Sequence, residues 1–328
     1  MGKGRRARGR RAATTATLLA VTVTAALAAG CTGGGGTPDD GRGSSGASER
    51  GASPSATGPA ALAVKLDNAA SARPHTGVDA ADVVYVEQVE GGLSRLMAVY
   101  ATRVPNTVGP VRSARESDLE LLRQFQRPTL VFSGAQKKLL PLIDEAPLRA
   151  VTPSDAPDAF YRGSDRAAPH NLFLRPGRIV PEAPGRAALT TGFRYGSAPA
   201  GGAPTTSRTV RYPAARFTFT WSDDRDRWLV GMDGAPATTA GGERMTAATV
   251  VVQYVKVRAS GFRDFLGNTS PYTETVGAGK ATVLRDGRAW EAVWKRPQAT
   301  DGTAFTTGDG SPVNFAPGQV WVVYAQAS

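Results

Sequence analysis

The chain of 328 residues contains a single cysteine, Cys31. A lone cysteine excludes any disulfide within the chain, so a folded body has to be stabilised by its buried apolar side chains. Residues 60–328 leave about 270 positions for that body, which is enough for one large domain or two modest ones. We therefore expect the sequence from residue 60 onward to contain its own hydrophobic core.

Cys31 follows a segment with the parts of a secretory signal peptide. Residues 1–11 carry six basic residues and no acidic one, and residues 12–30 form an uncharged, largely apolar run. This order is typical of secretory signal peptides. The Leu-Ala-Ala-Gly-Cys sequence matches the bacterial lipobox, so residues 1–30 are predicted to be a lipoprotein signal peptide and Cys31 the lipidated residue. The alternative is a plain signal peptide followed by an incidental cysteine.

Lipidation predicts a location. Two or three acyl chains hold a protein stably at a bilayer, so we expect an exported protein anchored to the outer face of the bacterial cytoplasmic membrane. The paired arginines near the N-terminus also resemble a twin-arginine export signal, and both the general and the twin-arginine route stay open. Residues 31–59 contain no large apolar residue, which predicts a disordered Gly/Ser/Pro linker. Treated as a flexible coil, the linker spans roughly 30 Å root-mean-square.

Charge restricts the class of partner. Six of the eleven net positive charges lie in residues 1–11, which leaves +5 on the mature chain. A mildly basic exported protein argues against nucleic acid as a partner and is compatible with anionic lipid head groups and anionic wall polymers.

The composition divides the remainder near residues 196–206, a run rich in Gly, Ala, Pro and Thr. Residues 60–198 mix strand-like stretches with helical spacing, which predicts an α+β domain. Residues 205–328 alternate Val-, Thr-, Tyr- and Trp-rich stretches with turn sequences, which predicts a mostly antiparallel β domain, as a sheet or a partly open barrel. In the first domain, strands are expected at 61–67, 82–89, 93–101 and 129–134, and helices at 114–125 and 135–143.

Several familiar sites are missing from the sequence. It contains no P-loop, no Gly-x-Gly-x-x-Gly after a strand, no Gly-x-Ser-x-Gly and no His-Glu-x-x-His. Its two histidines, His75 and His170, lie far apart in the chain. No metal site and no cofactor are therefore predicted.

Polar residues gather in four short segments of the first domain, each next to Gly or Pro. Convergent loops of this kind commonly build binding sites on rigid scaffolds. In "GPVRSAR" (109–115), two guanidinium groups can each hold a carboxylate or phosphate through two hydrogen bonds. We expect this stretch to be an anion-holding turn that leads into a helix N-terminus. The candidate ligand-binding residues are Asp67, Asn68, Arg73, Glu87, Arg95, Arg112, Ser113, Arg115 and Asn171.

Catalysis is the alternative to binding. Glu90, or Glu87, with Asp67 as its partner would suit a cell-wall glycan hydrolase or lyase. Glu90 ends a predicted strand just before Gly91 and Gly92, where a sharp turn would expose its carboxylate. The carboxylates at 87 and 90 cannot both face one side of a regular strand, because side chains alternate with period two.

His170 is the candidate general base, with Asn171 as its orienting residue or as an oxyanion donor. Ser113 is a possible nucleophile without a base beside it in the sequence. The five tryptophans of the second domain suggest either sugar stacking or core packing. Because Trp290 and Trp294 share one face of a strand, the core interpretation is favoured.

The polar segments resemble those of a known family, the YerB-like bacterial lipoproteins, which are built from paired N- and C-terminal domains of unknown function. The resemblance is carried by "LDNAASARPHTGVDAADVVYVEQVEGGLSR", "GPVRSAR" and "APHNL" in the first domain and by "GKATVLRDGRAWEAVWKRP" and "PGQVWVVY" in the second. It implies a fold and an envelope location, and no activity. Lys65 stands where a small apolar residue is usual, which predicts an edge strand at 61–67.

The sequence thus favours an extracytoplasmic lipoprotein that binds an anionic envelope ligand (cell-wall glycan, polymer or protein) through an Arg/Glu-lined site. One alternative is a hydrolase or lyase that uses Glu90 or His170. The other is a scaffold for an envelope enzyme, which would use the sheet edge or the exposed aromatics of the second domain.

Overall fold

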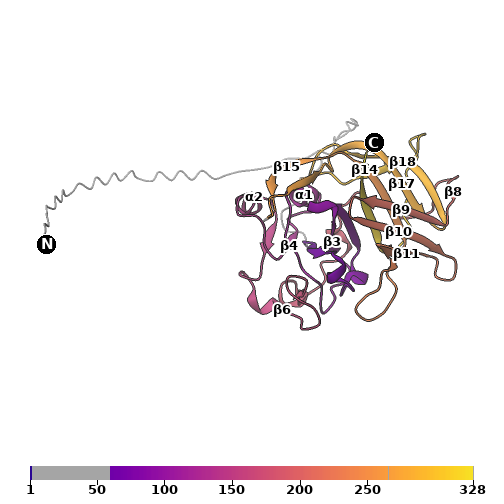
Figure 1. Ribbon diagram of the computed structural model, residues 1–328. Helices are drawn as coiled ribbons and strands as arrows, with labels where there is room; N and C mark the ends of the chain where they lie inside the picture. Colours follow the sequence, from indigo (N-terminus) through magenta and orange to yellow (C-terminus); the bar gives the residue numbers. More distant parts are fainter. Residues whose placement is uncertain (2–59, 265, 328) are drawn as a thin grey trace, which may run out of the picture. The chain divides into compact units, whose positions relative to one another are not determined.

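The computed structural model describes Met1, residues 60–264 and residues 266–327. The predicted signal peptide, Cys31 and the linker lie outside the described residues. From Ala60 onward, the described residues belong to one compact unit (Figure 1). No helix in this part of the chain combines the length and the apolar character needed to cross a membrane.

Strands make up most of the described structure. They are β1 (Leu62–Asp67), β2 (Val83–Gln88), β3 (Ser94–Tyr100), β4 (Thr129–Val131), β5 (Arg149–Val151), β6 (Phe160–Arg162), β7 (Leu172–Leu174), β8 (Ala203–Pro204), β9 (Ser207–Tyr212), β10 (Ala215–Ser222), β11 (Arg227–Met232), β12 (Ala235–Pro236), β13 (Thr246–Ala247), β14 (Thr249–Val255), β15 (Val257–Arg263), β16 (Thr269–Thr273), β17 (Gly277–Arg285), β18 (Arg288–Arg296), β19 (Ala304–Thr306) and β20 (Val320–Gln326).

The helices are short. The α-helices are α1 (Glu116–Leu122) and α2 (Leu140–Glu145), and the 3-10 helices are η1 (Ala70–Ala72), η2 (Val78–Ala80), η3 (Glu90–Gly92), η4 (Pro157–Ala159), η5 (Pro176–Arg178) and η6 (Arg186–Ala188).

The predicted α+β class is therefore only partly right, because the described chain is mostly β. Both helices predicted in the first domain are shorter than their apolar spacing suggests. α1 covers Glu116–Leu122 instead of 114–125, and the turn that follows it ends at Arg127, in the left-handed region with φ of 46°. Pro141 lacks a backbone N–H and occurs in the first turn of α2, where no intrahelical donor is needed.

The largest sheet has eleven strands and runs through both halves of the chain. Its order is β19-β18-β17-β14-β20-β2-β3-β1-β4-β5, and β8 pairs with β18. The halves meet where β20 lies parallel to β2, with Val83 opposite Val320 and Val86 opposite Val323. The residues on the two sides of the composition boundary at 196–206 therefore belong to one compact unit, and both sides contribute strands to this sheet.

The strand pairing of residues 205–328 also differs from the mostly antiparallel arrangement that the sequence predicted. β20 lies parallel to β14 as well as to β2, so the C-terminal strands are not a purely antiparallel sheet. Their other pairings are antiparallel: β14–β17, the β17–β18 hairpin, β18 with β19 and with β8, the β15–β16 pair, and a separate five-stranded sheet of order β12-β11-β10-β9, in which β13 pairs with β11.

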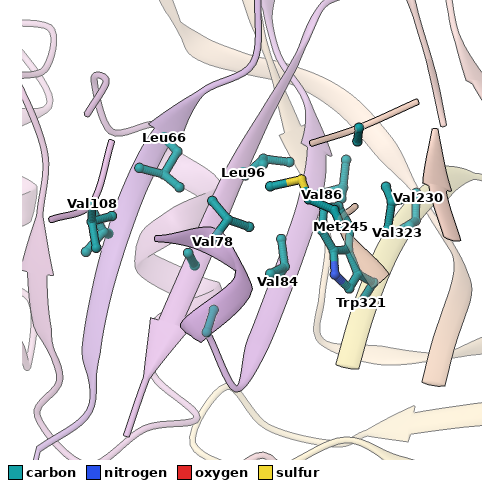
Figure 2. Packing of buried hydrophobic residues seen from close by; sticks show 14 of the residues in the cluster. Leu66, Val78, Val84, Val86, Leu96, Val108, Val230, Met245, Trp321 and Val323 are labelled. Atoms are coloured by element: carbon teal, nitrogen blue, oxygen red, sulfur yellow. The ribbon is translucent and has the colours of Figure 1, made fainter. Parts of the chain in front are cut away.

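Alternating side chains divide the core between the two faces of the large sheet. On one face, Trp321 of β20 packs against Phe217 and Phe219 of β10, which joins the large sheet to the five-stranded sheet. Figure 2 shows this cluster, with Val86 and Leu96 on one side and Val230 and Val323 near Trp321 on the other. The opposite face buries a second cluster beneath α1 and α2.

The tryptophans belong mainly to this core. Trp228, Trp290, Trp294 and Trp321 are buried, and Trp221 is partly buried beside Trp228. This finding supports core packing over sugar stacking for four of the five side chains.

The predicted edge strand at 61–67 is wrong. β1 lies between β3 and β4 in the interior of the sheet, and Lys65 is fully buried within it. A lysine is tolerated there because two carboxylates surround its ammonium group, as described below.

Candidate functional site

A row of charged side chains crosses the large sheet at one end of β1, β3 and β2. Asp67 lies opposite Arg95, and Arg95 lies opposite Glu87. Directly opposed residues point to the same face of a sheet, and Lys65 is on that face two positions before Asp67. The strands therefore carry apolar residues on this face for most of their length and charged residues at this end.

The inner part of the row is a buried ion cluster. The Lys65 ammonium group pairs with Glu87 and with Asp118 of α1, the latter at 2.7 Å, and Ser117 donates a hydrogen bond to Glu87 at 3.0 Å. Burial lowers the pKa of Lys65 to about 8, although Asp118 opposes the shift. Glu87, a predicted ligand-binding residue, is thus engaged in holding α1 to the sheet.

The outer part of the row opens into a cleft of about 720 Å³. It is lined by residues from both halves of the chain. These are Asp67, Ala69, Val89, Glu90, Leu93, Ser94, Arg95, Arg112, Ser113, Arg115, Ala135, Gln136, Lys137, Lys138, His170, Arg263, Asp264 and Leu266.

The cleft brings together seven of the eleven residues singled out in the first domain by the sequence. Asp67, Glu90, Arg95, Arg112, Ser113, Arg115 and His170 all line it. Segments separated by up to about a hundred residues therefore meet at one place, as the loop composition suggested.

Glu90 is buried, although the sequence predicted an exposed carboxylate. Arg115 donates two hydrogen bonds to it, at 2.6 and 2.7 Å, and Ser270 of β16 donates a third. The turn folds inward at Gly92, whose φ is 71° and where a Cβ would lie 2.5 Å from Pro213. Burial alone would raise the pKa of Glu90, but Arg115 and Ser270 outweigh it and hold the pKa at about 2.

Arg95 has the most unusual environment in the cleft. Its side chain extends from β3, and the residue is only 8% exposed. Nη1 donates to the backbone oxygen of Ser113 at 2.8 Å, and no carboxylate of the described residues forms an ion pair with Arg95. Burial and the nearby charge of Arg115 lower the pKa of Arg95 to about 9, which leaves the guanidinium group charged at neutral pH.

Asp67 joins two other cleft residues. Its Oδ2 accepts a hydrogen bond from His170 Nδ1 at 2.8 Å and lies 3.2 Å from Arg112 Nε, while Oδ1 accepts from the N–H of Ala69 at 3.2 Å. Burial would raise the pKa of Asp67, but these hydrogen bonds and the charges of Arg112 and Arg95 lower it below its usual range. Asp67 is therefore an ionised carboxylate fixed at both oxygens.

One donor of the predicted helix N-terminus is already occupied. Asp118 Oδ2 accepts a hydrogen bond from the backbone N–H of Arg115 at 2.7 Å, which caps α1 from within.

The remaining predicted residues lie outside the cleft. Asn68 donates to Ser94 at 2.8 Å, and Arg73 forms an ion pair with Asp233 at 2.8 Å. Asn171 accepts from Arg162 at 2.7 Å and donates to the backbone of Gly163 at 2.8 Å, so Asp67 orients His170 and Asn171 does not.

Sequence reasoning missed the opposite wall of the cleft. Lys137 and Lys138 precede α2, Arg263 is the last residue of β15, and Asp264 and Leu266 belong to the segment that leads from β15 to β16 in the second half. The adjacent lysines are a basic pair that the sequence displays. Nothing in the sequence places the β15–β16 segment against residue 136, where the Arg263 N–H donates to the side chain of Gln136 at 3.1 Å.

Within the described ranges, no group of three or more His, Cys, Asp or Glu side chains is arranged to hold a metal ion. The chemistry available in the cleft is therefore that of guanidinium groups, lysines, one imidazole and ionised carboxylates.

Comparisons with known proteins match nearly all of the described chain. The model described as "Protein of unknown function (DUF3048) N-terminal domain" matches residues 47–189, and the DUF3048 C-terminal domain model matches residues 208–322. A Bacillus subtilis (strain 168) protein named "Putative lipoprotein YerB" is 42% identical over 64 residues, which are 20% of this chain and 19% of that protein. A crystal structure of YerB from Bacillus subtilis has the same fold, with a TM-score of 0.68 and 20% identity over 84% of this chain and 94% of that one.

Proposed function

The chain belongs to the family of YerB-like proteins with paired DUF3048 domains, and from this premise we propose that it is an exported, lipid-anchored protein that binds an anionic envelope ligand in the cleft around Arg95. Anchoring through Cys31 is supported by the lipobox and by the relative that is named a lipoprotein. The linker would let the folded body reach ligands roughly 30 Å from the membrane.

The observation that carries the proposal is the charge of Arg95. A buried cation without a counterion is costly, since neither water nor a carboxylate compensates it. Arg115 is paired with Glu90 and Arg112 contacts Asp67, whereas Arg95 is hydrogen-bonded to a backbone oxygen and is favoured by Glu90 and Asp67 only at longer range. An anion in the cleft would supply the missing charge.

The lining as a whole has the same sign. It includes six basic side chains, Arg95 among them, and three acidic ones. A guanidinium group matches carboxylate and phosphate oxygens through two parallel hydrogen bonds. Leu93 and Leu266, at 44% and 71% exposure, add apolar surface to the wall. This combination suits an anionic glycan or polymer, whose sugar or alkyl groups need apolar contacts, better than a small inorganic ion.

The glycan-hydrolase alternative receives less support from the geometry. A two-carboxylate mechanism needs one carboxyl group that is protonated near neutral pH. Glu90 is held ionised by Arg115, and Glu87 is buried against Lys65. We therefore do not propose Glu90 as a general acid.

Sedimentation with purified cell walls tests the binding proposal. Full-length protein in detergent is mixed with walls at low and high salt, and the pellet is assayed for protein. We expect binding that weakens with salt. Arg95→Gln should weaken it by roughly tenfold to a hundredfold, the range for losing hydrogen bonds to a charged group.

Arg216→Gln is the matched control, because this arginine is exposed on β10 and does not line the cleft. A parallel sample of walls stripped of phosphodiester-linked polymers distinguishes phosphate from carboxylate as the bound group. Absence of wall binding, or equal binding by the two glutamine variants, would overturn the proposal. Thermal melting of each variant verifies that it is folded.

A further inference from the structure

The cleft contains an Asp–His pair that anion binding does not require. His170 Nδ1 lies 2.8 Å from Asp67 Oδ2, and Asp67 is fixed by further contacts with Arg112 and with the N–H of Ala69. Because an ionised carboxylate accepts hydrogen bonds, the proton of a neutral His170 is held on Nδ1. This places the lone pair on Nε2, on the opposite side of the ring.

The two histidines of the chain differ in their exposure and in whether Nε2 has a hydrogen-bond partner. These two properties distinguish a structural imidazole from a reactive one. His75 is 1% exposed, its Nε2 is hydrogen-bonded to the Asp67 carbonyl at 2.8 Å, and burial lowers its pKa to about 4. The His170 side chain is 24% exposed and lines the cleft, and Nε2 has no hydrogen-bond partner among the described protein groups. One imidazole therefore supports the backbone of Asp67, and the other is oriented by its carboxylate.

We propose that His170 is the general base of a phosphodiester hydrolase site in this cleft, with Asp67 as its positioning residue and Arg95 and Arg112 as the groups that hold the phosphate. The inference rests on the proposed anion site and names the class of its ligand. Arg112 and His170 meet at the same carboxylate oxygen of Asp67, so a phosphate held by Arg112 lies beside the imidazole.

The reaction is a hydrolysis that needs only water as co-reactant. His170 Nε2 takes a proton from water, and the water oxygen forms a bond to phosphorus. The bond from phosphorus to the leaving alcohol oxygen breaks, the alkoxide takes a proton from solvent, and the protonated imidazole releases its proton to solvent. The products are a phosphate monoester and an alcohol. Guanidinium groups stabilise the charge on the phosphoryl oxygens, which is the main requirement for catalysis of phosphoryl transfer.

A chromogenic diester tests the proposal. Full-length protein in detergent is incubated with bis(4-nitrophenyl) phosphate, and release of 4-nitrophenolate is followed. We expect turnover that falls by about 100-fold or more in His170→Gln, the usual range for loss of a general base. Asp67→Asn should lower kcat more than it raises KM, because it removes the carboxylate that orients the imidazole and leaves Arg95, which is hydrogen-bonded to the Ser113 backbone, in place. Arg216→Gln, prepared identically, should retain the wild-type rate.

Wall binding measured on the same preparations separates the two proposals. His170→Gln is expected to lose turnover by a far larger factor than wall affinity, since Arg95 is unchanged, whereas Arg95→Gln is expected to lose both. Binding without hydrolysis by the wild type, or hydrolysis that His170→Gln does not reduce, would overturn the catalytic proposal and leave the binding proposal intact. Should Asp67→Asn fail to fold, the partly exposed His170 still provides a decisive variant.

Discussion

At the scale of one residue, Lys65 shows that a buried ion pair contributes to the interior of this fold. Its ammonium group is fully buried between Glu87 and Asp118. Lys65→Met would leave both carboxylates buried without their cation, and breaking a buried ion pair in this way typically costs about 3–5 kcal/mol. We therefore expect a loss of that size in the free energy of unfolding, measured by urea titration. Lys295→Met, on the exposed side of β18, should change stability by less than about 0.5 kcal/mol. Equal effects of the two substitutions would contradict this role for Lys65.

At the scale of elements, Glu90 connects η3 to α1 through Arg115 and to β16 through Ser270. Its pKa of about 2 in the folded protein is below the usual 4.5, so the unfolded chain takes up the proton first as the pH falls. The stabilisation by Glu90 is therefore complete above about pH 4.5 and is lost as the pH falls toward 2. We expect the difference in unfolding free energy between wild type and Glu90→Gln to shrink over this interval. A Glu90 difference that does not change between pH 4.5 and 2 would refute the assignment.

At the scale of the molecule, one sheet and several contacts join the two halves. Tyr85 of β2 stacks on Tyr324 of β20, and Arg296 of β18 donates to the Glu120 carbonyl of α1 at 2.8 Å. Because β2 and β20 are neighbours within the sheet, neither half can unfold without exposing the core of the other. We expect a single unfolding transition. All five tryptophans lie in residues 205–328, so tryptophan fluorescence reports on that half, whereas far-UV circular dichroism reports on both. Midpoints that differ between the two signals would show that the halves unfold independently.

Local patterns in the sequence predicted the long strands of the large sheet correctly. Runs of apolar and β-branched residues located β1, β2 and β3, which are buried on both faces, and alternation located β18, which has one buried face. The same patterns overestimated the helices; in α2, apolar spacing does not register the constraint of Pro141. They also suggested an exposed Glu90, because its partners Arg115 and Ser270 are distant from it in the sequence.

Composition alone identified which residues carry charge near turns, and seven of the eleven residues selected in this way line the cleft. Composition did not reveal their pairing. Glu90 is paired with Arg115, whereas Asp67 is shared by Arg112 and His170. These partners depend on strand register and on loops that approach from other parts of the chain.

The sequence by itself determined the family, the strand pattern and the polar segments of the candidate site, because these follow from local composition, periodicity and motifs. Only the tertiary structure decided that Lys65 is interior, that Arg95 lacks a counterion and that Asp67 orients His170. It also added the wall formed by Arg263 and Leu266. The physical reason is that electrostatic environment depends on distances between groups that the chain brings together only when distant strands pair.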